Sequence, residues 1–292
     1  MSAMETWTIK KLLEWVSEYF ADKGVDSPRL SAELLLCDVL GLERIQLYTL
    51  YDRVVQPPQL AALRAMVKRA GEQEPIAYLV GRCEFYSLPL TITPDCLIPR
   101  PETEGLVEKA VHFLREREGT QHVLDLCTGS GCIAAAIAKN VEDSKIVATD
   151  LSDAALKVAA ENMEKLKLTE RVKVLCGDLF DPIIEGLDAA RFDLIVSNPP
   201  YVSEAEYAAL DKNVKEYEPA NALLAGADGL DVYKRILENV DDFLKPDGVL
   251  MMEIGYAQGP AIRELLENSG VFKTITIEKD FANNDRIAIA QK

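Results

Sequence analysis

The chain has 292 residues, of which 48% are hydrophobic and 27% are charged, so it can bury a substantial core and is long enough for two domains. Its formal net charge of −16 repels naked DNA and RNA, because nucleic-acid binding depends on Lys and Arg side chains that neutralise phosphates. The charge is −2 over residues 1–85 and −14 over the remainder. This balance favours a protein or small-molecule partner, although the net charge does not exclude a local basic patch.

The sequence shows no membrane or secretion signal. No run of about 18 apolar residues is present, and the N-terminus lacks a cationic segment followed by an apolar core. The six cysteines are scattered without a Cys-x-x-Cys pair, which suits a reducing cytoplasm and argues against structural zinc. The two histidines, His112 and His122, are too few for most histidine-based metal sites. We therefore expect a cytoplasmic protein without a metal.

The first 80 or so residues are predicted to be helical. Apolar residues recur at helical spacing from Ile9 to near Gly24, from Pro28 to near Gly41, and over about residues 58–70. Such short amphipathic helices bury little alone, so we expect a small bundle over residues 1–84. Residues 85–100 are rich in strand-forming residues and carry prolines, which predicts a β-hairpin linker.

From residue 101 to 292, predicted strands alternate with predicted helices, the pattern of a doubly wound α/β domain. The predicted strands cover residues 122–126, 145–150, 172–176, 192–197, 248–254, 273–279 and 286–291. The predicted helices cover residues 103–117, 132–139, 154–166, 233–243 and 259–268. Only a few residues join the final two strands, so they should form a hairpin whose last strand runs antiparallel.

A glycine-rich turn joins the first strand of this domain to the next helix. Its residues are Cys127, Thr128, Gly129, Ser130 and Gly131. Glycine lets the backbone approach a ligand closely, and the helix start presents free N–H groups.

An acidic residue follows the turn at the end of the next strand. Asp150 lies 19 residues after Gly131, where its carboxylate can accept hydrogen bonds from both ribose hydroxyls of a nucleotide-like ligand. The turn also fits the dinucleotide pattern Gly-x-Gly-x-x-Ala. These two features alone leave a nicotinamide cofactor and S-adenosylmethionine equally open.

Two further features favour S-adenosylmethionine. Asp125 lies two residues before the turn and could meet the cationic amino-acid end of that cofactor, directly or through water. Asp178 and Leu179 follow the third strand, where the carboxylate could accept from an adenine amino group while the leucine packs on the ring. Asp178 could equally be an ordinary acid at a strand end.

The fourth strand of the domain ends in Asn198, Pro199, Pro200 and Tyr201. The prolines fix φ and cannot donate hydrogen bonds, so this backbone is rigid and its carbonyls stay free. If the Asn198 side-chain oxygen and the Pro199 carbonyl accept both N–H bonds of a planar amide or amine, its lone pair is directed toward a sulfonium methyl. Tyr201 offers a ring face to the same planar group. The sequence therefore predicts a nitrogen methyltransferase.

Beyond these residues, the chain closely resembles the peptide chain release factor glutamine methyltransferases over nearly its full length. The stretches that carry the resemblance are Pro75–Gly81, Phe85–Tyr86, Leu97–Glu104, the glycine turn, Asn198–Tyr201, Glu218–Leu223, Asp228–Leu230 and Asp285–Arg286. Arg100 and Glu102, in the third stretch, are expected to cap a helix start locally and to help shape the pocket.

The resemblance implies a specific reaction and fold. Such enzymes transfer a methyl group from S-adenosylmethionine, leaving S-adenosylhomocysteine, to N5 of the glutamine in the Gly-Gly-Gln loop of bacterial class 1 release factors. It implies a docking role for residues 1–84 and a Rossmann-like class I methyltransferase domain of seven strands at 101–292. We expect a monomer that binds neither nucleic acid directly nor membrane.

The family's cofactor contacts carry over to residues 127–131, Asp150, Asp178, Leu179 and Asn198. One residue departs from the family pattern, since Cys127 stands where the family usually has the first glycine of the turn. Cysteine should fit there if φ is negative, whereas a strained φ would weaken cofactor binding.

Three other functions fit the sequence less well. An adenine-N6 or guanine-N2 nucleic-acid methyltransferase could use the same tetrapeptide, but the net charge of −16 and the lack of a basic recognition segment oppose it. A dehydrogenase would explain the glycine turn but not the tetrapeptide. A non-catalytic binding protein is opposed by the intact Asn198 and Pro199.

Overall fold

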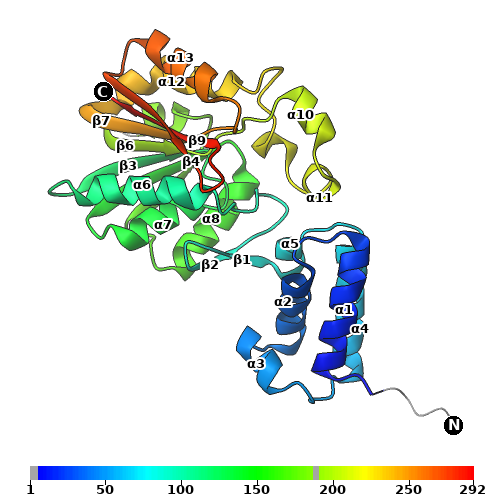
Figure 1. Ribbon diagram of the computed structural model, residues 1–292. Helices are drawn as coiled ribbons and strands as arrows, with labels where there is room; N and C mark the ends of the chain where they lie inside the picture. Colours follow the sequence, from blue (N-terminus) through cyan, green and yellow to red (C-terminus); the bar gives the residue numbers. More distant parts are fainter. Residues whose placement is uncertain (1–5, 187–190) are drawn as a thin grey trace. The chain divides into compact units, whose positions relative to one another are not determined.

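The computed structural model describes residues 6–186 and 191–292, which form two compact units (Figure 1). The helical unit contains Met1–Arg82 together with Lys212–Tyr217, and the α/β unit contains Cys83–Asp211 together with Glu218–Lys292. Residues 1–5 of the predicted helical domain lie outside the described residues. The helical unit is thus assembled from two separate stretches of chain, whereas residues 1–84 were expected to form a domain alone.

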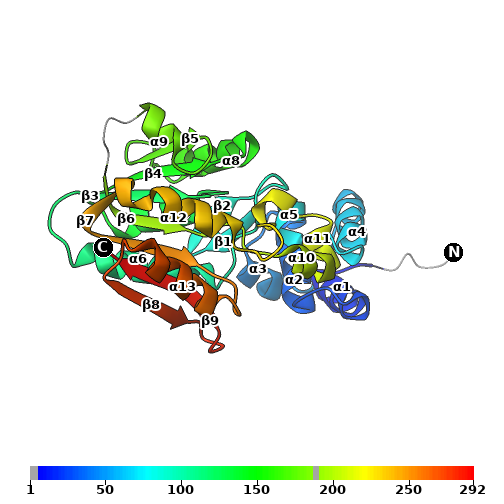
Figure 2. The same cartoon turned by 90° about the horizontal axis from the view of Figure 1, so that it is seen from above.

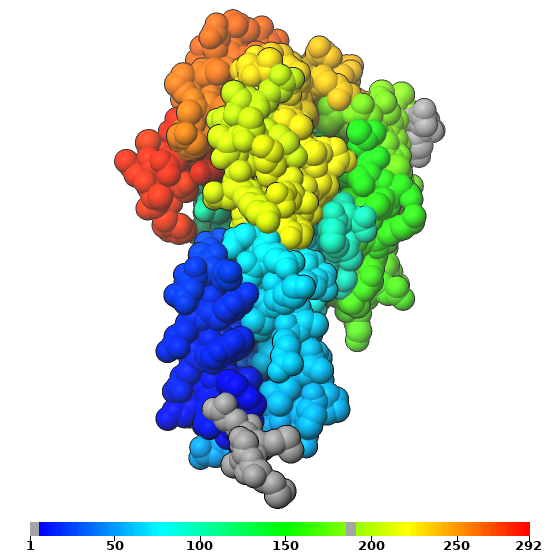
Figure 3. Space-filling view, turned by 90° about the vertical axis from the view of Figure 1, so that its right-hand side faces the viewer, coloured from blue at the N-terminus to red at the C-terminus, as the bar shows by residue number. Residues whose placement is uncertain are grey.

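Five helices build the first part of the helical unit. They are α1 (Ile9–Lys23), α2 (Pro28–Leu40), α3 (Arg44–Thr49), α4 (Pro57–Gly71) and α5 (Ile76–Val80). Gly24 and Gly41 end α1 and α2 in the left-handed conformation, with φ of 68° and 64°, which glycine adopts without steric cost. The face of residues 6–82 that is visible in Figure 3 is a continuous surface, coloured blue to cyan.

The core of the helical unit contains a buried charged group. Glu33 on α2 is 1% exposed, among buried residues such as Phe20 and Leu36. Its carboxylate accepts hydrogen bonds from Arg29 (3.0 Å), from Arg44 (2.8 Å) and from the hydroxyl of Tyr48. Burial opposes the charged form, but the hydrogen bonds from Tyr48, Arg44 and Arg29 together hold the pKa of Glu33 below its usual range. This cluster ties α2 to α3.

We expect Glu33→Gln to lower the free energy of unfolding at pH 7 by about 1–3 kcal/mol, the cost of a poorly satisfied buried polar group. Because the folded-state pKa lies below the unfolded value, the carboxylate's contribution is present at neutral pH and lost as pH falls through the folded pKa. Thermal melts should therefore separate the variant from the wild type at pH 7 and bring them together in acid. The same change at the exposed Glu14 should have little effect.

The α/β unit begins with a hairpin and continues as alternating strands and helices. The hairpin pairs β1 (Arg82–Phe85) with β2 (Leu88–Thr91). The other strands are β3 (Gln121–Leu126), β4 (Ser144–Asp150), β5 (Val172–Cys176), β6 (Phe192–Ser197), β7 (Leu244–Glu253), β8 (Thr274–Lys279) and β9 (Asp285–Gln291). The larger helices are α6 (Thr103–Arg115), α7 (Cys132–Asn140), α8 (Asp153–Lys165), α12 (Asp231–Phe243) and α13 (Gly259–Ser269).

Seven of these strands form one sheet in the order β5-β4-β3-β6-β7-β9-β8, which Figure 2 shows from edge to edge. The neighbours from β5 to β7 pair in parallel, and β9 runs antiparallel to both β7 and β8. The prediction of a seven-stranded α/β domain with an antiparallel last strand is confirmed. The chain order reverses at β3 and β6, which makes their carboxyl ends the switch point where ligands bind in such sheets.

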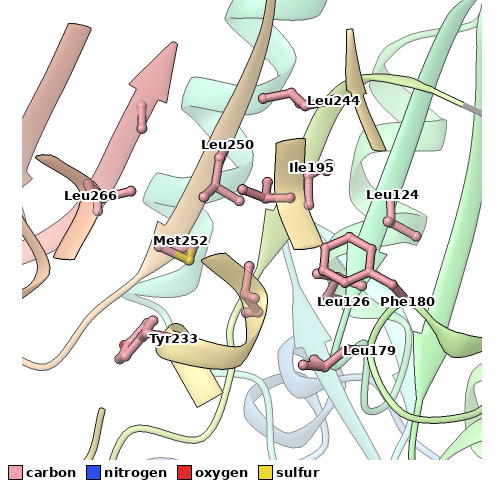
Figure 4. Close-up of a cluster of buried hydrophobic side chains, with 14 of the residues drawn as sticks. Leu124, Leu126, Leu179, Phe180, Ile195, Tyr233, Leu244, Leu250, Met252 and Leu266 are labelled. Atoms are coloured by element: carbon pink, nitrogen blue, oxygen red, sulfur yellow. The ribbon is translucent and has the colours of Figure 1, made fainter. Parts of the chain in front are cut away.

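Helices cover both faces of this sheet. Helices α6, α7 and α8 lie on one face and α12 and α13 on the other (Figure 1). Between the sheet and helices α12 and α13, a buried apolar cluster forms. It includes Leu124, Ile195 and Leu250 from three neighbouring strands and Tyr233 and Leu266 from the two helices (Figure 4). Because both faces are covered, β3 and β6 are almost wholly buried rather than alternately buried and exposed.

Several short elements were not predicted. They are α3, α5, α9 (Asp181–Gly186), α10 (Glu204–Ala209), α11 (Lys212–Lys215) and the 3₁₀ turn Ala220–Ala222. Each has six residues or fewer, which is too short to show a helical period in sequence. Within residues 6–186 and 191–292, no helix is both long and apolar enough to cross a bilayer.

Candidate active site

The glycine turn after β3 is held by a buried carboxylate. Asp125 is 0% exposed, and its Oδ2 accepts hydrogen bonds from the hydroxyl of Thr128 (2.6 Å) and from the N–H of Ala134 (3.2 Å) at the start of α7. Burial raises the pKa of Asp125 to about 7. Asp125 does not line the cavity described below. Its Oδ2 shapes the turn, and its Oδ1 is buried without a hydrogen-bond partner among the described residues. The contact of Asp125 with the cationic end of a ligand stays a prediction.

Cys127 begins the turn in a conformation that disfavours any side chain. Its φ is +59°, in the left-handed region, as are Gly129 at +56° and Gly131 at +79°. For a residue with a Cβ this conformation costs roughly 1–2 kcal/mol. Of the two cases that the sequence leaves open at Cys127, the structure has the strained one, with a positive φ.

Replacing Cys127 with glycine should relieve this strain. Glycine also loses more chain entropy on folding, by about 0.5–1 kcal/mol, so we expect the unfolding free energy to stay level or rise by about 1 kcal/mol. Calorimetric titration should show an unchanged or slightly improved affinity for S-adenosylmethionine. The control Cys127→Ala keeps the Cβ and should show no gain, and a large loss of affinity in Cys127→Gly would contradict the prediction.

Asp150 joins the turn to the end of β4. Its Oδ2 accepts from the N–H of Gly129 (2.8 Å) and its Oδ1 from the N–H of Ser152 (2.9 Å). Burial raises the pKa of Asp150 above that of an ordinary aspartate. Each oxygen keeps a further lone pair, so the carboxylate can still accept from two ligand hydroxyls.

Leu151, directly after Asp150, was not identified from the sequence. It is 64% exposed although it is apolar, and it lines the same cavity. The available signal was its position next to the acidic residue at the strand end. Leu179 also lines the cavity; it is buried with φ of +47°, and its carbonyl accepts from the hydroxyl of Thr149 (3.1 Å). The two leucines give the cavity apolar surface near a carboxylate.

Asp178 forms an ion pair with an arginine side chain. Its Oδ2 accepts a 2.6 Å hydrogen bond from Arg235 on α12, and both side chains line the cavity. This ion pair is partly exposed, with side-chain exposures of 49% for Arg235 and 35% for Asp178, so solvent screens it. Asp178 is thus more than an isolated strand-end acid, and its Oδ1 has no hydrogen-bond partner within residues 6–186 and 191–292, so it can accept from a ligand.

The tetrapeptide after β6 brings Asn198 to the same place. The Nδ2 of Asn198 lies 3.2 Å from the hydroxyl of Thr103, the first residue of α6. The hydroxyl of Tyr201 donates to Glu253 (3.2 Å), at the end of β7. Burial raises the pKa of Tyr201 above its usual range, so this phenol stays protonated and remains a donor.

These elements surround a cavity of about 280 Å³, near the lower end of the volumes usual for small-molecule sites. The predicted residues that line it are Cys127, Thr128, Gly129, Ser130, Asp150, Asp178, Leu179, Asn198 and Pro200. Three predicted residues, Gly131, Pro199 and Tyr201, do not line it. Gly131 instead permits close packing of α7 on α8, since a Cβ there would lie 2.8 Å from Met163.

The comparisons with known proteins agree with this geometry. The PrmC N-terminal domain family matches residues 11–81, and the methyltransferase small domain family matches residues 107–217. The release factor glutamine methyltransferase of Rhodopirellula baltica is 43% identical over 98% of this chain and 97% of its own length. The relative of the same description from Geobacter sulfurreducens is 42% identical over 94% of this chain and 93% of its own length.

The chain belongs to the release factor glutamine methyltransferases. It is therefore an enzyme with a methyltransferase domain, as predicted. Among solved structures, the catalytic domain of hMettl16 in complex with an MAT2A 3'UTR hairpin covers 82% of this chain and 84% of its own, with a TM-score of 0.56. At 17% identity that likeness shows the shared fold alone.

In this release factor glutamine methyltransferase, a second buried carboxylate joins two segments of the cavity wall. Glu218 accepts from the N–H of Ile98 (3.3 Å) and from the guanidinium of Arg100. The side chain of Glu218 is 2% exposed and that of Arg100 is 33% exposed, so the carboxylate is buried while the guanidinium keeps contact with solvent. Arg100 therefore joins the two segments rather than capping a helix locally, and Glu102, at the N-cap of α6, makes no capping hydrogen bond with its side chain.

Proposed function

We propose that this enzyme transfers the methyl group of S-adenosylmethionine to the side-chain N5 of the glutamine in the Gly-Gly-Gln loop of bacterial class 1 release factors. The observation that carries the proposal is the position of Asn198. It lines the same cavity as the glycine turn and Asp150, at the carboxyl edge of the sheet. A methyl donor held by the turn would therefore lie next to an amide acceptor.

The donor set of the cavity suits S-adenosylmethionine. The carboxylate of Asp150 can accept from ribose hydroxyls, and Leu151 and Leu179 offer apolar surface for adenine. Asp178 has an oxygen available for the adenine amino group, and the turn brings backbone close to the ligand at Gly129. The bound cofactor supplies a methyl group on a positively charged sulfur.

The protein's part in the reaction is orientation and charge stabilisation. An amide nitrogen is a poor nucleophile because its lone pair is delocalised into the carbonyl. The Asn198 side-chain oxygen and the Pro199 carbonyl accept its two N–H bonds, which directs the lone pair toward the methyl group and stabilises positive charge on nitrogen. As the C–N bond forms and the C–S bond breaks, S-adenosylhomocysteine leaves, and the methylated nitrogen then loses a proton without needing a strong base.

We assign roles to the other parts of the chain on the same basis. Residues 1–84 dock the release factor, residues 85–100 link the domains, and residues 101–292 bind the cofactor. The enzyme acts as a cytoplasmic monomer on a protein, without binding nucleic acid. The net charge of −16 and the 43% identity to a release factor glutamine methyltransferase over 98% of the chain support this choice over a nucleic-acid substrate.

The function is tested by methyl transfer from labelled cofactor to a purified release factor. We expect label on the wild-type factor and none on a factor whose loop glutamine is replaced. Label that persists on the replaced factor, or that appears on DNA or ribosomal RNA instead, would refute the proposed substrate.

Asn198→Ala should reduce turnover by about 10²-fold or more, the usual cost of one preorganised contact to developing charge. The dissociation constant of S-adenosylmethionine should change far less, because Asn198 acts on the acceptor nitrogen. Steady-state kinetics and calorimetry on the same preparation separate the two effects, and unchanged turnover would disprove the assigned role.

Asp150→Ala should mainly weaken cofactor binding, by about 10- to 100-fold, as expected when hydrogen bonds to a charged group are lost. Part of this loss would come from the turn, since the N–H of Gly129 also loses its acceptor. Asp153→Ala is the matched control, because that neighbouring acid is exposed and does not line the cavity. An unchanged dissociation constant in Asp150→Ala would exclude the ribose contact.

A further inference from the structure

Behind Asn198, a chain of hydrogen bonds runs through three separate elements. The Nδ2 of Asn198, after β6, lies 3.2 Å from Oγ1 of Thr103 at the start of α6. That hydroxyl lies 2.6 Å from Oε2 of Glu253 at the end of β7. Thr103 and Glu253 are each 1% exposed, so no bulk solvent replaces either partner.

The chemistry of the three groups determines which group donates and which accepts in each of these hydrogen bonds. A carboxylate only accepts hydrogen bonds, so the single proton of the Thr103 hydroxyl is committed to Glu253. The hydroxyl oxygen can then only accept from Asn198, which must present its NH₂ group to Thr103. The side-chain oxygen of Asn198 is consequently left facing away from Thr103.

Burial raises the pKa of Glu253 above its usual value, and three neighbouring groups act against that shift. Hydroxyl donors reach both oxygens, from Thr103 and from Tyr201 (3.2 Å), and the nearby cation of Arg286 favours the carboxylate. Glu102 is the nearby charge that opposes it. The N-terminal end of α6 adds its own partial positive charge on the side of Thr103.

We propose that Thr103, oriented by Glu253, is a positioning residue for methyl transfer that fixes the Asn198 amide with its oxygen toward the substrate nitrogen. The proposal rests on the function proposed above, because it names how the acceptor atom of that site is selected. The glutamine side chain brings two N–H donors to the site. An Asn198 amide turned by 180° would meet them with its own NH₂ and offer no acceptor.

Among the described residues, Thr103 makes the side-chain hydrogen bond that holds the rotation of the Asn198 amide. The two ends of an amide are nearly equal in size, so packing distinguishes them poorly. Thr103→Val keeps the shape of the side chain and removes its hydroxyl. Thr103→Ser keeps the hydroxyl and removes only the methyl group.

The test compares these variants at saturating cofactor and release factor. We expect Thr103→Val to lower kcat about 10- to 100-fold, as misorientation of a contact group does, and to leave the dissociation constant of S-adenosylmethionine unchanged. Thr103→Ser should recover most of the wild-type kcat. A merely structural role would not give this split or this rescue.

Tyr233→Phe is the matched control for stability. It removes another buried hydrogen bond to Glu253, from the Tyr233 hydroxyl to the backbone carbonyl (2.8 Å), and does not touch Asn198. We expect it to lower the melting temperature as Thr103→Val does while kcat is retained. Wild-type kcat in Thr103→Val, or an equal loss of kcat in Tyr233→Phe, would overturn the proposal.

A second measurement does not depend on turnover. Thr103→Val and Asn198→Ala remove opposite ends of one hydrogen bond, so their effects on stability should not add in the double variant. Strictly additive shifts in melting temperature would overturn the proposed positioning role of Thr103, even if the enzyme methylates release factors. Absence of methyl transfer by the wild type would instead refute the proposed function, and the cycle would still decide whether Thr103 holds Asn198.

Discussion

The parallel pairing of β3, β4, β5 and β6 is the constraint on which the site depends. Hydrogen bonding places Leu126 opposite both Thr149 and Ser197, and Asp150 opposite Cys176. The four strands therefore end at one level, and the segments that follow them must meet at one edge of the sheet. Residues far apart in sequence, such as those of the glycine turn and Asn198, become the walls of one cavity without any direct bond between them.

Buried carboxylates hold the segments that follow those strands. Asp125 shapes the turn, Glu218 joins two stretches of the cavity wall, and Glu253 accepts from Thr103 and Tyr201. A buried carboxylate without donors is costly, so each also enforces the local backbone that brings its donors. The much larger number of exposed acidic side chains behind the −16 charge does nothing comparable, because solvent screens them.

Much of the site could be predicted from the sequence because each of its segments is recognisable from residues that are neighbours in the chain. The strand β6 is a buried strand with the apolar run 194–196, and Asn198 follows its last residue; Asp150 follows the glycine turn at the spacing of a nucleotide site. Periodicity also located the longer helices to within a few residues. These features depend on neighbours in the chain.

The missed features depend on contacts that no local pattern encodes. Thr103 and Asn198 are 95 positions apart, and Arg100 and Glu218 are 118 apart. The positive φ of Cys127 could not be predicted from the sequence either, because a cysteine, unlike a glycine, does not indicate a left-handed backbone. The hydrogen bonds from Thr128 and Ala134 to the buried Asp125 were missed as well, because its place beside the turn indicates only a possible ligand contact.

The discontinuous helical unit has a consequence for how the protein is made. Residues 212–217 belong to it, and the hydroxyl of Tyr217 donates to the carbonyl of Glu72 (3.3 Å). On the ribosome, the first 82 residues emerge together, yet their unit is completed only after most of the sheet strands have been synthesised. A gene fragment that stops after Arg82 encodes the five helices without the segment that finishes their surface.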